Sequence, residues 1–326
     1  MRSRLTGFCA VAAVAALGIG GLKAQQASEF PNKVMTIIGY SNPGGPLDLL
    51  ARSLADGLRG QYGKPVIVEN RVGAAGITAS LYLKKQPPDG HTLFYGTMTT
   101  AIFAPQIRAQ LPYDTRTDFT PIALTTSYTL ILVARPTLPF KTLDEFVDYA
   151  KKNPGKLNYA TNGIGAWTHI AMELFQERTG AKLTHVPYTG HAPALQALLA
   201  GDIEMAMLDI NIAKSYIDAG TLRVIGQLGT ERTPQFPDVA TFGEKVPELA
   251  TEFWLGIFGP PGMAPGLVSK LNADINTFSQ SDVMKERAKL AYMNVRTEPA
   301  EAFRKRVEND WNFWGKVVRD KGIIVK

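Results

Sequence analysis

The hydrophobic positions of this chain alternate between two kinds of spacing. Short runs rich in β-branched and aromatic residues, such as "VMTIIGY", "KPVIVEN" and "TLFYGTM", are followed by segments in which apolar residues recur every three or four positions. In the segment 47–58, the apolar residues that share one helical face are Leu47, Leu50, Ala51, Leu54 and Leu58. This alternation of strands with amphipathic helices predicts an α/β protein with mostly parallel sheets.

A second set of such units follows the long strand-like run "FTPIALTTSYTLILVARPTLPF". Its strands are "KLNYAT", "KLTHVPY" and "EMAMLDI", and "TLRVIGQLG" then leads into a Pro-rich loop, while long helices fill the last third of the chain. We predict two α/β domains joined by two crossing strands, with a C-terminal helical extension and a ligand cleft between the domains. The predicted limits are 25–126 plus 229–326 for domain 1 and 127–228 for domain 2.

The first residues, "MRSRLTGFCAVAAVAALGIGGLKAQQ", have the layout of a secretory signal peptide. Two arginines precede an apolar run, and polar residues follow it. A membrane anchor is the alternative, but the run 5–22 is short and rich in Gly and Ala for a spanning helix. We therefore predict that residues 1–24 are a signal peptide cleaved near Ala24 and that the mature protein is secreted.

Composition and charge exclude several classes of protein. The single cysteine, Cys9, lies inside the predicted signal peptide, so the mature chain has neither disulfides nor cysteine ligands for a metal. Loss of residues 1–24 lowers the formal net charge from +6 to +3, because that segment holds three basic residues and no acidic ones. The remaining Lys and Arg residues are scattered, apart from a small group at 304–306, which argues against nucleic-acid binding.

The segment "NPGGPLD" joins the first strand to its helix. Helix capping accounts for part of it: Pro46 fits the first helical position, and Asp48 lies in the first turn, where a carboxylate stabilises the helix dipole. The N–H groups of Gly44 and Gly45, next to Pro43, can approach a ligand closely at the positive end of a helix. We predict that this loop binds a carboxylate or phosphate.

Similar loops recur after other strands, which strengthens this interpretation. The loop "ENRVGAAGITAS" contains Gly73, Ala74 and Gly76, and "YTGHAPALQALLAG" contains Tyr188 and His191. The loop "YATNGIGAWTHIAMELF" contains Thr161, Gly163, Gly165 and Thr168. In an α/β sheet these loops lie at the carboxyl ends of strands, where ligands bind. Several helix N-termini around one cleft would form a binding site for an anion.

The remaining candidate residues each have a structural interpretation beside the functional one. Thr97 and Thr99 either hydrogen-bond a ligand or end a strand, Asp209 is a loop cap or a ligand contact, and Trp167 is a cleft wall or a packed side chain. His169 and His191 lie near the glycine loops, and each is a structural residue or a general base. No G-x-S-x-G, H-E-x-x-H or dense acidic cluster is present, so we predict no catalytic residues, metal or cofactor.

The loops, in this order, resemble the Bug family of periplasmic solute receptors, the binding proteins of tripartite tricarboxylate transporters. The matching stretches include "NPGGPLDLLAR", "VENRVGAAGITAS", "PDGHTL", "VPYTGHAPALQALLAGDIEMAM" and "FWLGIFGPPGMAPGLVSKLN". The resemblance implies a two-domain Venus-flytrap fold, of type II-like periplasmic binding proteins. It also implies a small carboxylate held largely by backbone N–H groups of the loops at 43–46, 73–76 and 161–169. At Ala166, Trp167 and His191 the chain departs from the family, which favours bulkier walls and allows an aromatic carboxylate.

These observations lead to the hypothesis of a periplasmic, monomeric and non-enzymatic receptor. It binds a small mono- or dicarboxylate, aromatic ones included, and presents it to a membrane permease. One alternative is a ligand-sensing partner of a sensor kinase. The other is a secreted α/β hydrolase or isomerase with His169 or His191 as general base.

Overall fold

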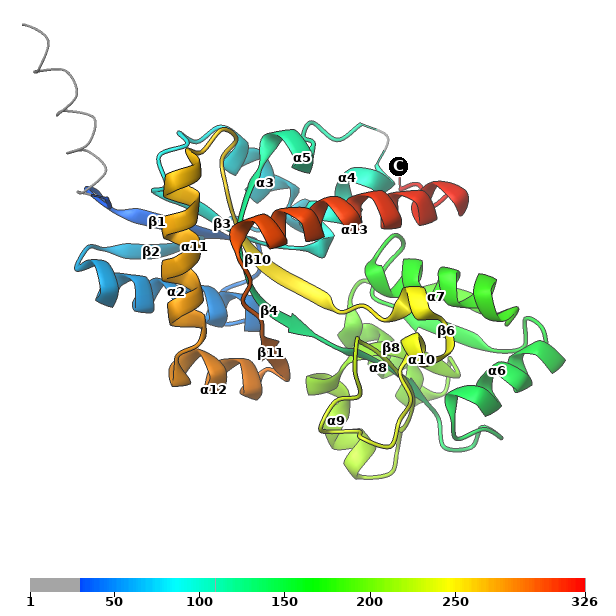
Figure 1. Cartoon of the computed structure of the whole chain (residues 1–326). Coiled ribbons are helices and arrows are strands. Elements are labelled where there is room, and N and C mark those ends of the chain that lie inside the picture. Colours follow the sequence, from blue (N-terminus) through cyan, green and yellow to red (C-terminus); the bar gives the residue numbers. More distant parts are fainter. Residues whose placement is uncertain (1–29, 109, 326) are drawn as a thin grey trace, which may run out of the picture.

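The computed structural model describes residues 30–108 and 110–325. The predicted signal peptide, 1–24, therefore lies outside the described residues. The chain forms two α/β lobes that lie side by side (Figure 1). β4 (Thr120–Tyr128) runs toward the second lobe, and β10 (Phe253–Gly259) runs back from it into the first. No helix of the described residues is both long and apolar enough to span a bilayer.

The first lobe is built on a six-stranded sheet in the order β11-β4-β10-β3-β1-β2. Its other strands are β1 (Met35–Gly39), β2 (Val66–Asn70), β3 (Thr92–Thr97) and β11 (Met293–Val295). One group of helices that contact one another is α2 (Pro46–Tyr62), α11 (Pro265–Ser279) and α12 (Asp282–Leu290). The remaining elements are η1 (Ala74–Gly76), α3 (Ile77–Lys84), η2 (Thr99–Phe103), α4 (Ala104–Ile107), α5 (Thr115–Asp118) and α13 (Ala300–Asp320).

The second lobe is built on a five-stranded sheet in the order β7-β6-β8-β5-β9. Its strands are β5 (Leu130–Ala134), β6 (Asn158–Thr161), β7 (Thr184–Pro187), β8 (Met205–Asp209) and β9 (Arg223–Leu228). Its helices are α6 (Leu143–Lys152), α7 (Trp167–Thr179), α8 (His191–Ala200), α9 (Ile210–Asp218), α10 (Phe242–Lys245) and η3 (Pro247–Leu249). Alternate residues of β5 belong to two hydrophobic clusters, Leu132 with α6, α7 and α10, and Ile131 with α8 and α9. Helices therefore cover both faces of this sheet.

Both sheets are mixed, so the expectation of mostly parallel sheets is wrong. β1 is parallel to β2 and β3, and β6 is parallel to β7 and β8. β10, however, is antiparallel to β3 and β4, and β5 is antiparallel to β8 and β9. The physical reason is that the chain crosses from the first lobe to the second and later returns. A strand that enters a sheet from the cleft must run against neighbours that end there.

The first crossing is short, because only Thr129 separates β4 from β5. The return is longer: residues 229–252 lie between β9 and β10, and α10 in this stretch contacts β9. Phe242 of α10 stacks on Phe175 of α7, with ring centroids 4.6 Å apart. We therefore propose that the stretch up to η3 belongs with the second lobe, whereas the predicted limits at 126/127 and 228/229 stay a prediction.

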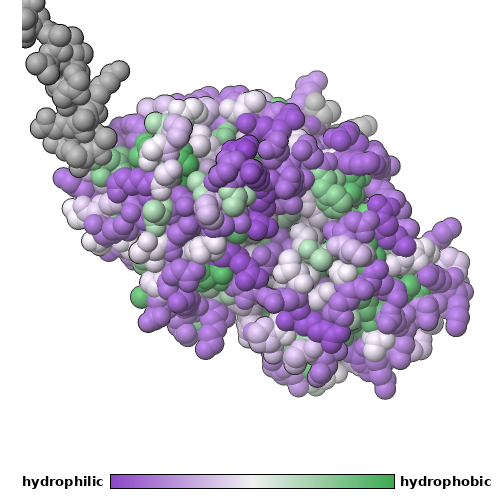
Figure 2. Space-filling model, in the orientation of Figure 1, coloured by the Kyte–Doolittle hydropathy of each residue, from purple (hydrophilic) through white to green (hydrophobic). Residues whose placement is uncertain are grey.

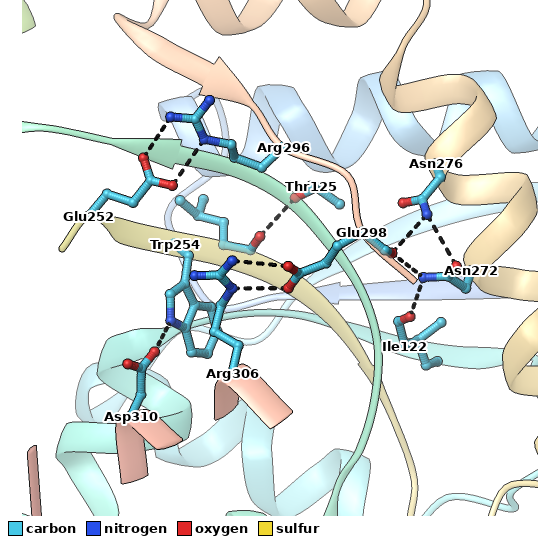
Figure 3. A network of polar contacts seen from close by, with 11 residues as sticks. Ile122, Thr125, Glu252, Trp254, Asn272, Asn276, Arg296, Glu298, Arg306 and Asp310 are labelled. Carbon is cyan, nitrogen blue, oxygen red and sulfur yellow. Dashed lines mark hydrogen bonds and ion pairs between the residues drawn. The ribbon is translucent and has the colours of Figure 1, made fainter. Parts of the chain in front are cut away.

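A partly buried polar cluster lies beside the crossing strands (Figure 3). Arg296 donates to both carboxylate oxygens of Glu252, each at 3.0 Å, and Arg306 pairs in the same way with Glu298 at 3.0 Å. The indole N–H of Trp254 donates to Asp310 at 2.6 Å. We call these six residues the crossing-strand cluster. The face of the molecule in Figure 2 is mainly hydrophilic and is indented between the lobes. The buried hydrophobic side chains form two clusters.

Candidate functional site

A cavity of about 290 Å³ lies between the two lobes and is lined by residues of both. Seven of the predicted site residues line it: Pro46, Thr97, Thr99, Trp167, Thr168, His191 and Asp209. The other twelve lie outside the lining: Pro43, Gly44, Gly45, Asp48, Gly73, Ala74, Gly76, Thr161, Gly163, Gly165, His169 and Tyr188. The loop 73–76 contributes no lining residue. At α2, α7 and α8 the first residues of the helix line the cavity, whereas the glycines before them do not.

Four helices present their N-termini to this cavity. They contribute Pro46 and Leu47 of α2, Trp167 and Thr168 of α7, His191 of α8, and Ile210 and Asn211 of α9. None of the four N-cap residues makes a side-chain capping hydrogen bond. The first N–H groups of a helix have no acceptor within the helix, and they carry the positive end of its dipole. The cavity therefore offers several uncompensated donors to an anion.

The two glycines of the first loop do not supply these donors. The N–H of Gly44 donates to the Asp48 carboxylate at 2.8 Å, and the N–H of Gly45 donates to the carbonyl of Asn42 at 3.3 Å. Gly44 has φ +83°, a left-handed conformation that favours glycine. Among the described residues, the N–H of Leu47 has no acceptor. The glycines thus shape the turn, and Leu47 presents the open donor.

Asp48 holds this turn together. Its carboxylate accepts hydrogen bonds from Gly44 N–H at 2.8 Å, Arg52 Nε at 2.9 Å and Asn70 Nδ2 at 2.8 Å. Burial acts to raise the pKa of Asp48, but the hydrogen bonds from Arg52, Gly44 and Asn70 outweigh it and hold the pKa below its usual value. Because these three donors already bind its carboxylate, the Asp48 side chain stabilises the loop and does not bind the ligand.

The loop 73–76 supports the cavity from behind. Ala74 and Ala75 both have positive φ, at 46° and 55°, which is uncommon for residues other than glycine. A Cβ at Gly76 would lie 2.3 Å from Thr100 and 3.2 Å from the ring of Tyr40. Tyr40 lines the cavity, and its hydroxyl lies 2.8 Å from Thr97 Oγ1. Gly76 therefore allows close packing behind the wall formed by Tyr40.

The loop 161–169 of the second lobe is fixed by internal hydrogen bonds. Gly165 N–H donates to His169 Nδ1 at 3.1 Å, and the Thr168 hydroxyl donates to Asn162 Oδ1 at 2.6 Å. The Thr161 hydroxyl lies 2.7 Å from Nε2 of His185. Among these residues, Asn162 and Thr168 face the cavity. The loop is consequently a rigid support for the first turn of α7.

Two of the histidines form a stacked pair behind this loop. The rings of His169 and His185 are 4.0 Å apart and nearly parallel. Burial lowers the pKa of His169, while the charge of Glu173 partly opposes this shift. Burial and the neighbouring His169 lower the pKa of His185 to about 4. Both rings are therefore neutral at pH 7, and neither lines the cavity, which fits a structural role.

At the other end of the cavity, His191 contacts Asp209. Nδ1 of His191 accepts a hydrogen bond from the backbone N–H of Asp209 at 3.1 Å and lies 3.4 Å from Oδ2 of the same residue. Tyr188 instead packs on the hydrophobic cluster of α8 and α9, and its N–H donates to Thr161 O at 3.0 Å. Tyr188 is thus part of the scaffold of the second lobe.

Sequence reasoning missed much of the cavity wall. Lining residues that it did not single out include Tyr40, Ser41, Leu47, Tyr128, Thr129, Asn162, Asn211, Phe253 and Tyr292. The Trp167 and Phe253 rings pack 5.5 Å apart, and the indole N–H of Trp167 and the hydroxyl of Ser41 are buried without a hydrogen-bond partner among the described residues. Tyr292 has φ +55°, a strained value often found at functional sites. Nothing in the sequence around Tyr292, which follows α12, indicates that it lines the cavity.

None of the described residues that line the cavity is Lys or Arg, so the groups on its wall that can attract an anion are the helix N-termini. Within residues 30–108 and 110–325, no group of three or more His, Cys, Asp or Glu side chains is placed to hold a metal ion. Thr99 begins a π-helical turn directly after β3, a rare element that is frequent at functional sites.

Comparison with known proteins identifies the family. The family described as "Tripartite tricarboxylate transporter family receptor" matches residues 50–323. The chain belongs to this family. It is also 30% identical over 302 residues to the protein BugT of Bordetella pertussis, covering 92% of this chain and 93% of BugT. The predicted resemblance to the Bug receptors and the two-domain fold of periplasmic binding proteins are thereby confirmed.

Solved structures of this receptor family have the same fold. A Rhodopseudomonas palustris protein solved with adipate has a TM-score of 0.75 and 28% identity, covering 90% of this chain and 99% of that one. MatC of R. palustris, solved with bound malate, has a TM-score of 0.71 and 30% identity, covering 89% of this chain and all of its own length. The fold and the family are those of solute-binding proteins.

Proposed function

We propose that this protein is a periplasmic receptor that binds a small organic carboxylate between its lobes and delivers it to a membrane permease. The observation that carries the proposal is the cavity itself, into which four helices direct N-termini without side-chain caps. Such donors suit a carboxylate. The adipate and malate bound to two relatives support this ligand class, and the family description supports the permease.

Binding is coupled to the arrangement of the lobes, because the donors come from both of them. α2 belongs to the first lobe, whereas α7, α8 and α9 belong to the second. A carboxylate that contacts both sets stabilises the closed arrangement over the open one. The observed affinity therefore depends on how strongly the ligand prefers the closed state.

A screen of carboxylates tests the proposal. Ligands that bind only the folded protein raise its melting temperature by mass action, so thermal shifts in a panel of mono-, di- and aromatic carboxylates identify candidates for calorimetry. Thr99→Val removes a cavity hydroxyl and is expected to weaken binding several-fold, corresponding to about 1 kcal/mol. Thr117→Val, at an exposed position of α5, is the matched control. A broad panel without a single binding carboxylate would contradict the proposal.

Catalysis is the competing function, and the surroundings of His169 speak against it. Its Nδ1 is engaged by Gly165 N–H, its pKa is lowered by burial, and its side chain lies outside the cavity lining. We expect any ligand that binds to be recovered unchanged after prolonged incubation. Conversion of the ligand that is lost in His191→Ala would show an enzyme instead.

A further inference from the structure

Asp209 places a carboxylate in a cavity otherwise suited to anions. It ends β8 and precedes α9, and it lines the cavity with its side chain about one-third exposed (35%). Although it occupies the N-cap position, its side chain makes no capping hydrogen bond. Its Oδ2 lies 3.4 Å from Nδ1 of His191, but that nitrogen accepts the Asp209 backbone N–H at 3.1 Å. A nitrogen that accepts this N–H cannot also donate to the carboxylate.

Among the described residues, no hydrogen bond to the Asp209 carboxylate is found, which sets it apart from other shielded acidic groups. Asp48 accepts three hydrogen bonds, and Glu252 and Glu298 each form a two-bond pair with an arginine. Shielded carboxylates are normally paired, because removal from water without a partner is costly. Asp209, whose side chain is about one-third exposed (35%), thus has an open acceptor beside the cavity that it lines.

The surroundings of Asp209 specify the partner that would satisfy it. No Lys or Arg is among the described residues that line the cavity, so the protein itself provides no cation. Tyr128, Trp167 and Phe253 line the same cavity, and aromatic faces attract cations. The negative charge of Asp209, after burial, contributes to raising the pKa of Tyr128 well above its usual value, which shows that the two side chains share one environment. A ligand with only negative groups would be repelled here.

We propose that the ligand is a zwitterion, with a carboxylate held by helix N-termini and an ammonium group that donates to Asp209. This inference rests on the proposed function, because it assumes that the cavity binds a carboxylate. The ammonium group neutralises Asp209, while the ligand carboxylate neutralises the positive ends of α2 and α7. A volume of about 290 Å³ is at the small end for ligand pockets, which favours a compact amino acid.

A series of acids with one carbon skeleton tests the proposal. The series comprises pentanoate, 2-hydroxypentanoate, 2-aminopentanoate, 5-aminopentanoate and glutarate, with 3-phenylpropanoate and phenylalanine as an aromatic pair. Dissociation constants are measured by calorimetry on residues 25–326. Because a charged hydrogen bond contributes about 1.5 kcal/mol or more, we expect the best amino acid to bind at least about tenfold more tightly than its parent acid.

Variants assign this preference to the carboxylate. Asp209→Asn keeps the shape of the side chain and removes its charge, and it is expected to abolish the preference by weakening only the amino acids. Asp218→Asn is the matched control, because it makes the same change at the other end of α9, at an exposed position paired with Lys214. It is expected to leave every dissociation constant unchanged.

Four results would overturn the inference, and the last of them also contradicts the proposed function. If carboxylates bind but the amino acids bind no more tightly than their parent acids, the ammonium site is wrong and the receptor function stands. The same holds if Asp209→Asn preserves the preference, or if glutarate binds most tightly and Asp209→Asn strengthens it. If no member of either skeleton binds, the proposed carboxylate receptor is contradicted together with the inference.

Discussion

The cavity and the crossing-strand cluster differ in whether their polar groups have hydrogen-bond partners. The cluster consists of Glu252, Trp254, Arg296, Glu298, Arg306 and Asp310. In the cluster, Arg296 and Arg306 each donate two hydrogen bonds to a carboxylate (Figure 3). In the cavity, the first turns of four helices and the Asp209 carboxylate are left without such partners among the described residues. The cluster is complete without a ligand, whereas the cavity is complete only with one.

This difference separates what stabilises the fold from what serves binding. A shielded polar group that already has its partner contributes to stability, and its loss destabilises the protein. A group left without a partner destabilises the free protein slightly and is satisfied by the ligand. We therefore expect changes in the cluster to alter stability, and changes in the cavity to alter affinity.

The largest expected effect is the loss of stability in Arg296→Met. This change leaves the Glu252 carboxylate, whose side chain is only 11% exposed, without its two hydrogen bonds. Breaking a buried pair on one side costs several kcal/mol, and partial exposure of Arg296 reduces this to about 3 kcal/mol. Urea denaturation measures this loss in the free energy of unfolding. Arg304→Met breaks an exposed pair with Glu301 that solvent screens, so it is expected to leave the stability nearly unchanged, and equal losses in the two variants would contradict the expected difference.

Asp310→Asn is expected to stabilise the protein near neutral pH. Burial raises the pKa of Asp310 to about 6, while hydrogen bonding to Trp254 and the charge of Arg306 oppose the shift. The folded state thus binds the proton more tightly than the unfolded state. Stability from this group is present at low pH and is lost as pH rises through about 6.

The pKa of Asp310 in the folded state lies about two units above its usual value, which corresponds to about 3 kcal/mol of stability. The amide of Asn accepts a weaker hydrogen bond from Trp254, so the expected gain in stability of Asp310→Asn is about 2 kcal/mol at pH 7.5. Parallel denaturation of both proteins from pH 4.5 to pH 7.5 measures the difference. A gain that does not grow with pH would mean that Asp310 is not the group responsible.

The smallest expected effects concern the glycines of the first loop. Gly44→Ala places a side chain at φ +83° and is expected to cost about 1 kcal/mol of stability. Gly45→Ala has φ −73° and room for a Cβ, with Asn42 O at 3.4 Å, so its stability is expected to change little. In neither variant do we expect more than about a twofold change in ligand affinity, as measured by calorimetry, because both N–H groups are bound inside the protein. A large loss of ligand affinity in Gly45→Ala would show instead that the glycine N–H groups bind the anion.

Much of the fold could be predicted from local patterns. The apolar spacing predicts a helix over 47–58, which lies within α2. The glycine-rich loops were placed correctly at the cleft end of the strands. These features depend on residues close together in the chain, where periodicity and capping preferences apply.

The direction of the crossing strands and the final shape of the cavity could not be predicted in this way. β5 and β10 run against their neighbours because the chain enters each sheet from the cleft, a constraint set by the other lobe. Tyr128, Phe253 and Tyr292 are far apart in the sequence and meet only in the folded protein. The structure was also needed to exclude the glycine N–H groups as donors to the anion, because their acceptors, Asp48 and Asn42, are not evident from the sequence.

We expect first-turn N–H groups of helices to hold the ligand carboxylate, and not the glycines before them. Amide NMR spectra of the mature protein, recorded during titration with a binding carboxylate, test this directly. The largest downfield shifts of amide protons are expected at Leu47, Trp167 and Thr168. Dominant shifts at Gly44, Gly45, Gly73 and Gly76, with Leu47, Trp167 and Thr168 unmoved, would contradict it.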